Sequence, residues 1–275
     1  MKINTVWGVY FSATGTTEKI VTCLAEAVAR LMDAEYKSYS FNLPKARANR
    51  LTFSKEDLVV LGTPVYAGRV PNVLLPFLRD NILGNGTSAV PITVFGNRNF
   101  DDALIELCGI LQGNGFCTVS AGAFVGEHSF STILGAGRPD DNDMALVLEL
   151  AEKAAVKIMN KTNQTAENVL VTGNEPIRPY YTPRDRHGTP INILKVKPKT
   201  DASKCTNCGL CSSICTMGSI NPADVCEVSG ICIKCCACVK KCPAHAKYFD
   251  DEGFLYHKRE LEDIYQHRAP VELFY

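Results

Sequence analysis

Eight cysteines in the C-terminal part of the chain have spacings suited to metal binding. In each of two sets, three cysteines are separated by two residues and a fourth follows after three more. The first set is Cys205, Cys208, Cys211 and Cys215, and the second is Cys232, Cys235, Cys238 and Cys242. Every cysteine of the first set recurs 27 residues later, which indicates an internal repeat of one metal-binding unit. Three thiolates at this spacing can converge on three corners of one iron–sulfur cubane.

The spacing resembles that of bacterial-type two-cluster ferredoxins, in which the fourth cysteine of each set closes the other cluster. The resemblance implies that one [4Fe–4S] cluster is held by Cys205, Cys208, Cys211 and Cys242, and the other by Cys232, Cys235, Cys238 and Cys215. One position departs from the pattern: Thr216 follows the first set, where proline is usual, whereas Pro243 follows the second. Because this proline is not a ligand, the departure leaves the predicted ligation unchanged.

Other uses of these cysteines fit less well. Two zinc ribbons would use four thiolates in pairs and leave the third cysteine of each set unused. A disulfide framework belongs to secreted chains, and the N-terminal residues do not resemble a signal peptide. We therefore expect reduced thiols and a cytoplasmic location. Cys226 and Cys236 fall outside the pattern, and a spare cysteine such as Cys236 is expected to be a small buried apolar residue.

A second candidate site lies near the N-terminus. The apolar run Ile3–Phe11 reads as a buried strand, and the hydroxyl-rich segment 12–17 separates it from a helix with apolar residues at helical spacing. Backbone N–H groups at a helix N-terminus attract anions, and nearby Ser and Thr hydroxyls can complete the hydrogen bonds. The loop contains no Lys or Arg, which favours a permanently held phosphate over phosphoryl transfer. A simple helix cap would explain only one or two of the hydroxyls.

The motif Ser12-x-Thr14-Gly15-x-Thr17 resembles the FMN phosphate loop of flavodoxins, and the resemblance extends over roughly the first 160 residues. It implies that FMN phosphate binds at Ser12, Ala13, Thr14, Gly15, Thr16 and Thr17. Two later loops match the pair that encloses the flavin ring. The first contributes Thr63, Pro64, Val65, Tyr66 and Gly68, and the second contributes Gly96, Asn97, Arg98, Asn99, Phe100 and Asp101.

Several residues near these loops are candidates for a more specific role. Tyr66, and after it Phe100, is a candidate to stack on the flavin, with core packing as the alternative for both. Arg69 or Arg98 could face the flavin ring, or could be a solvated surface arginine. His128, next to Glu127, is a candidate proton donor to flavin or substrate, although loop histidines are often structural. The candidate catalytic residues are therefore His128 and Arg98.

The elements that must position these loops alternate between strands and helices. We predict strands at 3–11, 34–41, 57–62, 89–95 and 118–125, with helices after most of them and a long amphipathic helix at 143–159. This alternation is typical of a doubly wound parallel sheet, whose ligands bind at the carboxyl ends of the strands. The expected fold class is a flavodoxin-like α/β domain with a five-stranded parallel sheet, followed by an α+β two-cluster ferredoxin domain.

We predict the domain boundaries from composition. Residues 1–175 form the flavodoxin-like domain, 176–200 a proline-rich connector, 201–249 the ferredoxin domain, and 250–275 a packing tail without chemistry of its own. The connector is either a plain linker or a strap that docks the cluster domain beside the flavin, since Tyr and Arg often anchor interfaces.

Composition narrows the possible partners. The chain has 275 residues, 46% of them hydrophobic, and a formal net charge of zero. The absence of a net charge favours neither nucleic acid nor a membrane surface as a partner, and no apolar run is long enough to span a bilayer. The expected partners are redox proteins, either a ferredoxin or a low-potential reductase, with a small-molecule acceptor as a further candidate.

The order of domains resembles fused flavodoxin–ferredoxin proteins of anaerobes, which implies electron transfer with FMN and two [4Fe–4S] clusters. Three functions remain open: an electron carrier without a substrate, an FMN-dependent reductase fed by the clusters, and a redox-sensing or assembly protein with structural clusters. No Gly-x-Gly-x-x-Gly loop occurs in the sequence, which disfavours direct reduction by a nicotinamide cofactor.

Overall fold

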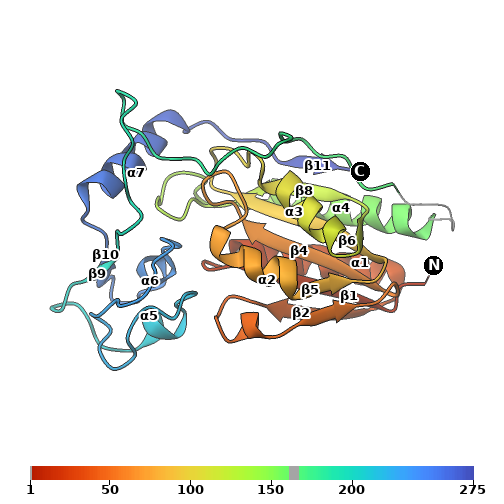
Figure 1. Ribbon diagram of the computed structural model, residues 1–275, viewed down its shortest axis with the longest axis horizontal. Coiled ribbons are helices and arrows are strands. Elements are labelled where there is room, and N and C mark those ends of the chain that lie inside the picture. Colours follow the sequence, from red (N-terminus) through yellow and green to blue (C-terminus); the bar gives the residue numbers. More distant parts are fainter. Residues whose placement is uncertain (1, 161–166) are drawn as a thin grey trace.

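The computed structural model describes residues 2–160 and 167–275. Its centre is a mostly parallel sheet with strand order β11-β8-β6-β4-β1-β2 (Figure 1). The parallel strands are β1 (Thr5–Tyr10), β2 (Glu35–Ser40), β4 (Asp57–Pro64), β6 (Thr87–Phe95) and β8 (Ala121–Val125). Counted in chain order, these five lie as 2-1-3-4-5, an order in which ligands bind where the chain reverses direction across the sheet, between β1 and β4.

Helices cover both faces of the sheet. On one face lie α1 (Thr16–Met32) and α4 (Asp141–Met159), which share a single apolar cluster with β1, β4 and β6. On the other face lie a short 3₁₀ turn (Asn72–Leu74), α2 (Leu75–Asp80) and α3 (Ala103–Gly113). The predicted doubly wound fold class is thereby confirmed.

The sheet has more strands than the five predicted. The predicted strand at 118–125 is two strands, β7 (Phe116–Thr118) and β8, because both pair with the nine-residue β6, β7 near its start and β8 near its end. The C-terminal β11 (Glu272–Phe274) adds an antiparallel edge to β8. Two short strands, β3 (Leu51–Phe53) and β5 (Ile82–Gly84), form a separate parallel pair.

Acidic residues lie at the beginnings of two helices. Asp102 is the N-cap of α3. The long helix α4 begins two residues before the predicted Asp143, because Asp140 caps it and Asp143 completes a reciprocal capping box. Asp102 also binds Arg178, and Asp140 and Asp143 bind Arg268, so these carboxylates connect local helix formation to long-range packing.

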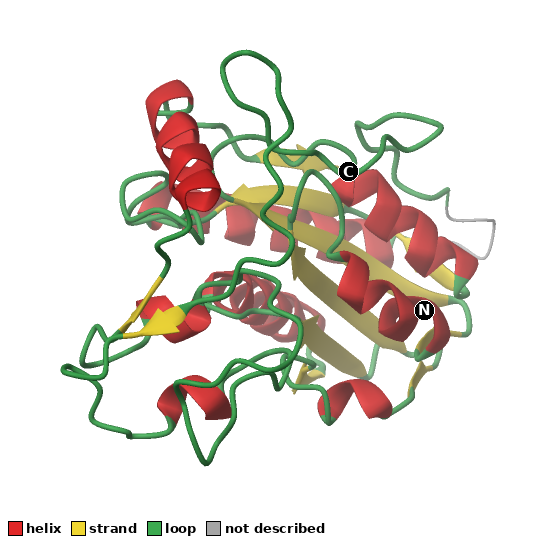
Figure 2. Cartoon of the chain, turned by 60° about the vertical axis from the view of Figure 1, so that its left-hand side comes forward, coloured by secondary structure: helices red, strands yellow, loops and turns green. Residues whose placement is uncertain are grey.

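The cysteine-rich region, residues 201–249, packs against the end of the sheet where the parallel strands finish (Figures 1 and 2). Its elements are short: α5 (Leu210–Ser213), α6 (Ala237–Lys240) and β10 (Lys247–Tyr248), which pairs with β9 (Lys199–Thr200) just before the region. Ala237 belongs to the same apolar cluster as Val9 and Phe77. The cysteine-rich region therefore shares a core with the sheet domain.

Polar contacts strengthen this packing. Lys240 Nζ donates to the carbonyl oxygens of His128 and Ser131, at 2.7 and 2.9 Å, and pairs with Glu127. An Arg47 guanidinium nitrogen lies 2.6 Å from the carbonyl oxygen of Thr216. Cations of each part thus bind backbone of the other, which restricts how the two parts can move relative to one another.

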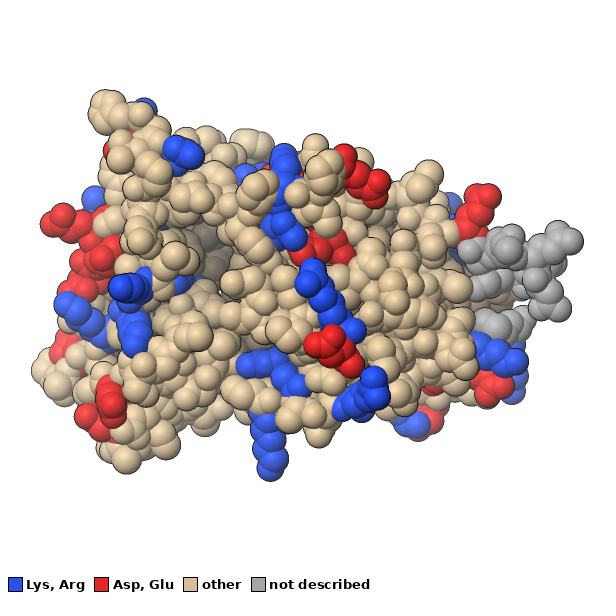
Figure 3. All heavy atoms as spheres, viewed as in Figure 1, with Lys and Arg blue, Asp and Glu red and all other residues tan. Residues whose placement is uncertain are grey.

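The exposed charges do not form a field of one sign. Figure 3 shows Lys and Arg side chains interspersed with Asp and Glu over the visible face, as a net charge of zero would suggest. Within residues 2–160 and 167–275, none of the helices has the length and apolar character needed to cross a bilayer.

Candidate functional site

A cavity of about 70 Å³, called here the inner cavity, lies at the carboxyl ends of the parallel strands. The first loop lines it with Ala13, Thr14, Thr16 and Thr17. The other strand ends and the cysteine-rich region complete the wall with Pro64, Val65, Tyr66, Val94, Phe95, Gly96, Gly126, Glu127, His128, Ser129 and Cys235. The fold therefore brings the first loop together with parts of both later loops.

The first loop has the properties of an anion cradle. Among the described residues, the backbone N–H groups of residues 13–17 have no hydrogen-bond acceptor. Gly15 has a φ of 106°, in the left-handed region that favours glycine, and it precedes the first turn of α1. Consecutive free N–H groups at a helix N-terminus suit a phosphate. The donor set therefore fits the phosphate of the predicted FMN.

Ser12 has a different role from its neighbours. Its hydroxyl oxygen accepts a hydrogen bond from the backbone N–H of Glu18 at 3.0 Å, and its own N–H donates to the side chain of Asn42. The side chain is buried and lies outside the residues that line the inner cavity. The Ser12 hydroxyl therefore binds a backbone N–H of the first turn of α1, as the helix-cap interpretation predicted. Thr14, Thr16 and Thr17 line the inner cavity instead.

The second loop is a tight turn. Tyr66 and Arg69 exchange backbone hydrogen bonds of 3.0 and 3.1 Å, and Ala67 and Gly68 between them have φ values of 51° and 76°. A Cβ on Gly68 would lie 2.5 Å from a carboxylate oxygen of Asp101, so glycine is required for both conformation and space. Thr63, by contrast, is fully buried in β4 and lines neither this cavity nor the one beyond it.

A second cavity, of about 230 Å³, adjoins the inner one and is called the outer cavity. Val65, Tyr66, Phe95, Gly96, His128 and Ser129 line both. Gly68, Arg98 and Asn99 line the outer cavity alone. Tyr66 is thus well placed to contact a flavin. Phe100 is buried, and its ring centroid lies 5.7 Å from that of Phe95, so its side chain packs in the core.

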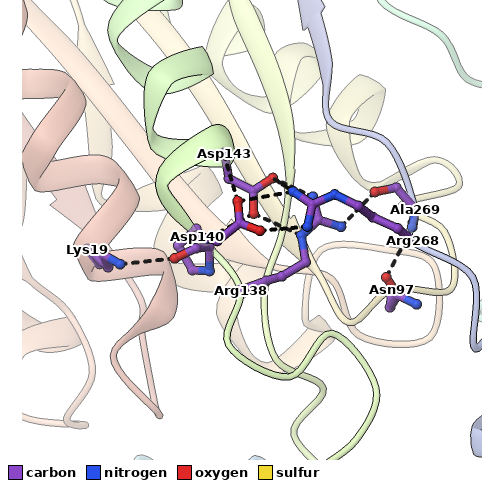
Figure 4. Close-up of polar contacts among 8 residues, drawn as sticks. Lys19, Asn97, Arg138, Asp140, Asp143, Arg268 and Ala269 are labelled. Carbon is purple, nitrogen blue, oxygen red and sulfur yellow. Dashed lines mark hydrogen bonds and ion pairs between the residues drawn. The ribbon is translucent and has the colours of Figure 1, made fainter.

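The Asn97 side chain forms hydrogen bonds with the C-terminal tail. Its amide nitrogen donates to the carbonyl oxygens of Tyr265 and His267, and its amide oxygen accepts from the N–H of Ala269. Figure 4 shows the adjoining network, in which Arg138 pairs with Asp143 and also donates to the carbonyl oxygen of Ala269. The Asn97 side chain holds the tail in place and lines neither cavity.

His128 lies where both cavities meet, but it does not pair with Glu127, whose carboxylate binds Lys240. Its ring packs on Gly96, where a Cβ would come within 2.3 Å. Nδ1 accepts from the N–H of Phe130 at 3.1 Å, so the proton of the neutral ring is on Nε2. Burial lowers the pKa of His128 to about 4, with nearby cations acting in the same direction. His128 is therefore a neutral hydrogen-bond donor at neutral pH.

The two arginines differ. Arg69 forms a bidentate pair with the buried Glu106, at 2.7 and 2.6 Å, and therefore neither faces the flavin loops nor is solvated freely. Arg98 lines the outer cavity, pairs with Asp101 and lies 5.0 Å above the ring of Tyr181. Of the two arginines, only Arg98 is therefore placed where it could face the flavin ring.

The eight patterned cysteines surround two further cavities in the cysteine-rich region. One is lined by Cys205, Cys208, Cys211 and Cys242, and the other by Cys215, Cys232, Cys235 and Cys238, together with the buried Cys236. Within residues 2–160 and 167–275, no three His, Cys, Asp or Glu side chains are placed to share a single metal ion. The ligands of a cubane bind separate irons at its corners, so they surround a volume instead of converging on a point.

The sulfur atoms also receive hydrogen bonds at repeated positions. The N–H of Ser219 donates to Cys215 Sγ, and the N–H of Ala246 donates to Cys242 Sγ, both at 3.3 Å. The hydroxyl of Thr216 lies 3.7 Å from Cys235 Sγ. Such bonds stabilise thiolates. The donor set in both cavities therefore fits iron–sulfur ligation.

Residues 176–200 run across the surface of the sheet domain and are called the strap. Tyr180 donates to the carbonyl oxygen of Val70, and the N–H of Tyr181 donates to that of Ala67, both at 2.8 Å. Arg178 binds the buried carboxylate of Asp102 through its side chain and its backbone N–H. The strap therefore holds the second loop of the sheet domain.

Replacing Asp102 by asparagine is expected to destabilise the protein by roughly 2–4 kcal/mol, because the buried carboxylate accepts charge-assisted bonds that an amide cannot accept. Hydrogen bonds from Arg178 lower the pKa of Asp102. Its contribution is therefore complete at neutral pH and is lost as the pH falls below about 4. Urea unfolding at several pH values measures both effects.

The matched control is Asp263→Asn, since Asp263 pairs with Arg186 of the strap at an exposed position and exposed pairs contribute little. Equal stability of the Asp102→Asn variant and this control would contradict the anchoring role of Asp102.

The sequence interpretation missed two contributors from other parts of the chain. Helix α7 (Glu252–Ile264) brings His257 and Leu261 into the wall of the outer cavity. Lys240 comes from the cysteine-rich region and binds the loop that carries His128. No spacing signal marks either residue. An apolar face of α7 can be recognised in the sequence, but what it covers cannot.

Comparison with known proteins supports the N-terminal assignment. A family profile described as the flavodoxin domain matches residues 9–100. Among solved structures, a flavodoxin from the domain Archaea has 13% identity and a TM-score of 0.43, and the alignment covers 57% of this chain and all of that one. The flavodoxin of Streptococcus pneumonia TIGR4 has 19% identity and a TM-score of 0.40, with 56% and 99% covered.

Flavodoxin 2 from Bacillus cereus has 18% identity and a TM-score of 0.41, with 56% of this chain and 99% of that chain covered. No curated protein matches the chain. The profile match, together with the mostly parallel sheet covered by helices on both faces, gives the N-terminal domain of this protein a flavodoxin-like α/β fold.

Proposed function

We propose that this protein transfers electrons between two [4Fe–4S] clusters in the cysteine-rich region and FMN in the flavodoxin-like domain. When bound, each cluster would exchange one electron at a time and FMN one or two. The observation that carries the proposal is the position of Cys235, which lines both a cysteine cavity and the inner cavity beside Thr14 and Thr16. One side chain thus belongs to both sites.

The placement of the two cysteine groups supports an order of transfer. Ile233 and Lys234 of the second group line the outer cavity, and Cys235 lines the inner one. The cavity of Cys205, Cys208, Cys211 and Cys242 is lined by residues of the cysteine-rich region and Thr200 alone. We therefore assign the second group, Cys232, Cys235, Cys238 and Cys215, as the partner of the flavin, with the first group as the outer station.

Tyr66 lies between the two sites and lines both the inner and the outer cavity. Burial, followed by the nearby thiols of Cys235, Cys236 and Cys232, raises the pKa of its phenol well above the usual value. The hydroxyl therefore stays protonated, and Tyr66 places a neutral aromatic side chain in the wall that the inner and outer cavities share.

Anaerobic reductive titration followed by EPR and absorbance tests the proposal. We expect about eight irons and one flavin per chain, and electron exchange between them within the milliseconds of ordinary turnover. A preparation that holds zinc, or one whose flavin and clusters are reduced without exchanging electrons on that timescale, would refute it. The second outcome would favour structural clusters.

Thr216→Val tests the hydrogen bond to Cys235. Because a hydrogen bond to a ligand sulfur stabilises the reduced cluster, we expect the valine variant to lower the reduction potential of the second cluster by roughly 20–60 mV. Thr216 is buried, and valine preserves its shape. An EPR-monitored titration should show the first cluster unchanged and Thr216→Ser close to the parent. A shift of equal size in both clusters would contradict a local hydrogen bond.

A further inference from the structure

The repeat of 27 residues places a lysine in one half where the other half has an isoleucine. Ile220 follows Cys215 by five positions, and Lys247 follows Cys242 by the same five. In both halves the N–H of the residue just before this position donates to the Sγ of that cysteine, at 3.3 Å. The backbone thus follows the same local course in the two halves, and Ile220 and Lys247 occupy matched positions.

The two matched residues line different cysteine cavities. Lys247 lines the cavity of the first group and Ile220 that of the second, and they are only 3% and 4% exposed. Among the residues that the structure describes, Lys247 is the only charged one that lines either cavity. The two cavities therefore differ by one buried positive charge.

Neutral oxygen atoms hold this charge in place. Lys247 Nζ donates to the hydroxyl of Thr200 at 2.6 Å and to the carbonyl oxygen of Val225, and both residues line the same cavity. Within residues 2–160 and 167–275, exposed lysines of this region pair with aspartates, but no carboxylate pairs with Lys247. Burying an ammonium group without an anion is unfavourable. A cubane with four thiolate ligands is anionic and becomes more so on reduction, so it can supply the missing negative charge.

We propose that Lys247 sets the reduction potential of the first cluster, whose reduced form its buried charge stabilises more than that of the second cluster. A positive charge in the cavity wall favours the more negative of two oxidation states. The equilibrium concerned moves one electron from the reduced second cluster to the oxidised first cluster, and no bond or proton changes place. This inference rests on the proposed function and deepens it, because Lys247 favours holding an electron at the outer station.

Two neutral variants test the role of the charge. Lys247→Gln keeps an amide donor for the Val225 carbonyl, and Lys247→Met keeps only the approximate length of the side chain. In protein loaded with FMN and iron, we expect both to change the equilibrium constant for electron exchange between the clusters roughly tenfold, which places the first cluster ~59 mV lower. Lys247→Arg keeps the charge and should resemble the parent.

An anaerobic redox titration monitored by EPR measures the potential of each cluster. The signal of the first cluster is identified by its loss in Cys208→Ala, because no spare cysteine lines that cavity. Lys199→Met is the matched control, since Lys199 lies in β9, its side chain is 61% exposed and it pairs with Asp250. Both potentials should be unchanged in this control, because solvent and salt screen an exposed charge.

Iron analysis decides the case in which a neutral variant does not load fully. Loss of about four irons from Lys247→Gln and Lys247→Met, with about eight retained in Lys247→Arg, supports the proposal because only the charge is restored. Loss of iron from all three variants overturns it, since hydrogen bonding and packing would then be what the lysine supplies. Unchanged potentials, an equal shift of both clusters, or an equal shift in Lys199→Met overturns it as well.

The outcomes separate this inference from the proposed function. A parent protein that exchanges electrons between clusters and FMN, with fully loaded Lys247 variants of unchanged potential, overturns the role of Lys247 alone. A shift of the first cluster in a protein whose clusters never exchange electrons with FMN overturns the proposed function and leaves the role of Lys247 supported. A parent protein that holds zinc overturns both.

Discussion

Replacing Cys235 by alanine is expected to abolish cluster-dependent reduction of the flavin while leaving the flavin bound. Cys235 lines both the second cysteine cavity and the inner cavity, so the substitution removes a ligand at the point where the two sites meet. We expect iron to fall from about eight to about four per chain, because a cubane loses one of its four anchoring thiolates. Stopped-flow reduction by a reduced ferredoxin, together with iron and flavin analysis, measures the effect.

The neighbouring Cys236 is buried and lines the same cysteine cavity, so it is the thiol best placed to substitute for a missing ligand. The variant is therefore made in a Cys236→Ala background, and Cys236→Ala alone is the matched control. Cys226→Ala, at an exposed cysteine outside the pattern, is a second control. Flavin reduction at the parent rate in the double variant would remove Cys235 from the transfer path.

Thr16→Asp is expected to weaken FMN binding strongly without unfolding the domain. Thr16 lines the inner cavity at the first turn of α1, where a carboxylate would compete with the phosphate for the free N–H groups. Two unit charges about 4 Å apart repel by roughly 1–4 kcal/mol at a partly exposed site, which corresponds to roughly 5- to 1,000-fold in Kd. Fluorescence titration of the apoprotein with FMN measures the change.

The same charge favours the helix itself, because a carboxylate near a helix N-terminus is stabilising by about 0.3–1 kcal/mol. Loss of FMN affinity should therefore occur with an unchanged or higher melting temperature of the apoprotein. Thr22→Asp is the matched control, since Thr22 lies later in α1 and its hydroxyl bonds back to the carbonyl oxygen of Glu18. Equal FMN affinity in the two aspartate variants would show that the first loop does not hold the phosphate.

The prediction for Cys235 depends on how the cysteine-rich region meets the sheet domain. Lys240 binds the loop of His128, and Arg47 binds the loop of Thr216. Each contact joins a cation of one part to carbonyl oxygens of the other, and Ala237 lies in the apolar core below the sheet. The two parts therefore have a defined relative position, which is what transfer of electrons between fixed centres requires.

Local patterns in the sequence were sufficient for the five main parallel strands of the sheet domain. The alternation of strands and helices and the Ser12–Thr17 loop are short-range features, because strand and helix periodicity depend on neighbouring residues. The additional strand β11 was missed because its three residues, Glu272–Phe274, have no strand signal of their own and pair only because the tail returns to β8.

The candidate site was predictable only in part, because contacts between separate elements decide which loop side chains face the cavities. Loop positions follow from the strand ends, but whether a side chain faces the cavity depends on what packs behind it. Thr63 and Phe100 are buried in the sheet and core, and Asn97 holds the tail. Arg69 is satisfied by Glu106, which lies 37 residues away on α3. These outcomes follow from contacts between separate elements, which no local pattern contains.

The amino-acid sequence alone determined the twin cysteine sets, the hydroxyl-rich loop and the order of strands and helices, because each is a matter of residue type and short spacing. Only the tertiary structure decided that Cys235 lines the inner cavity and that His257 closes the outer one. Both residues lie more than 100 positions beyond the loops they meet. Apolar burial and the anchors of the strap bring them there, and these depend on the packing of the whole chain.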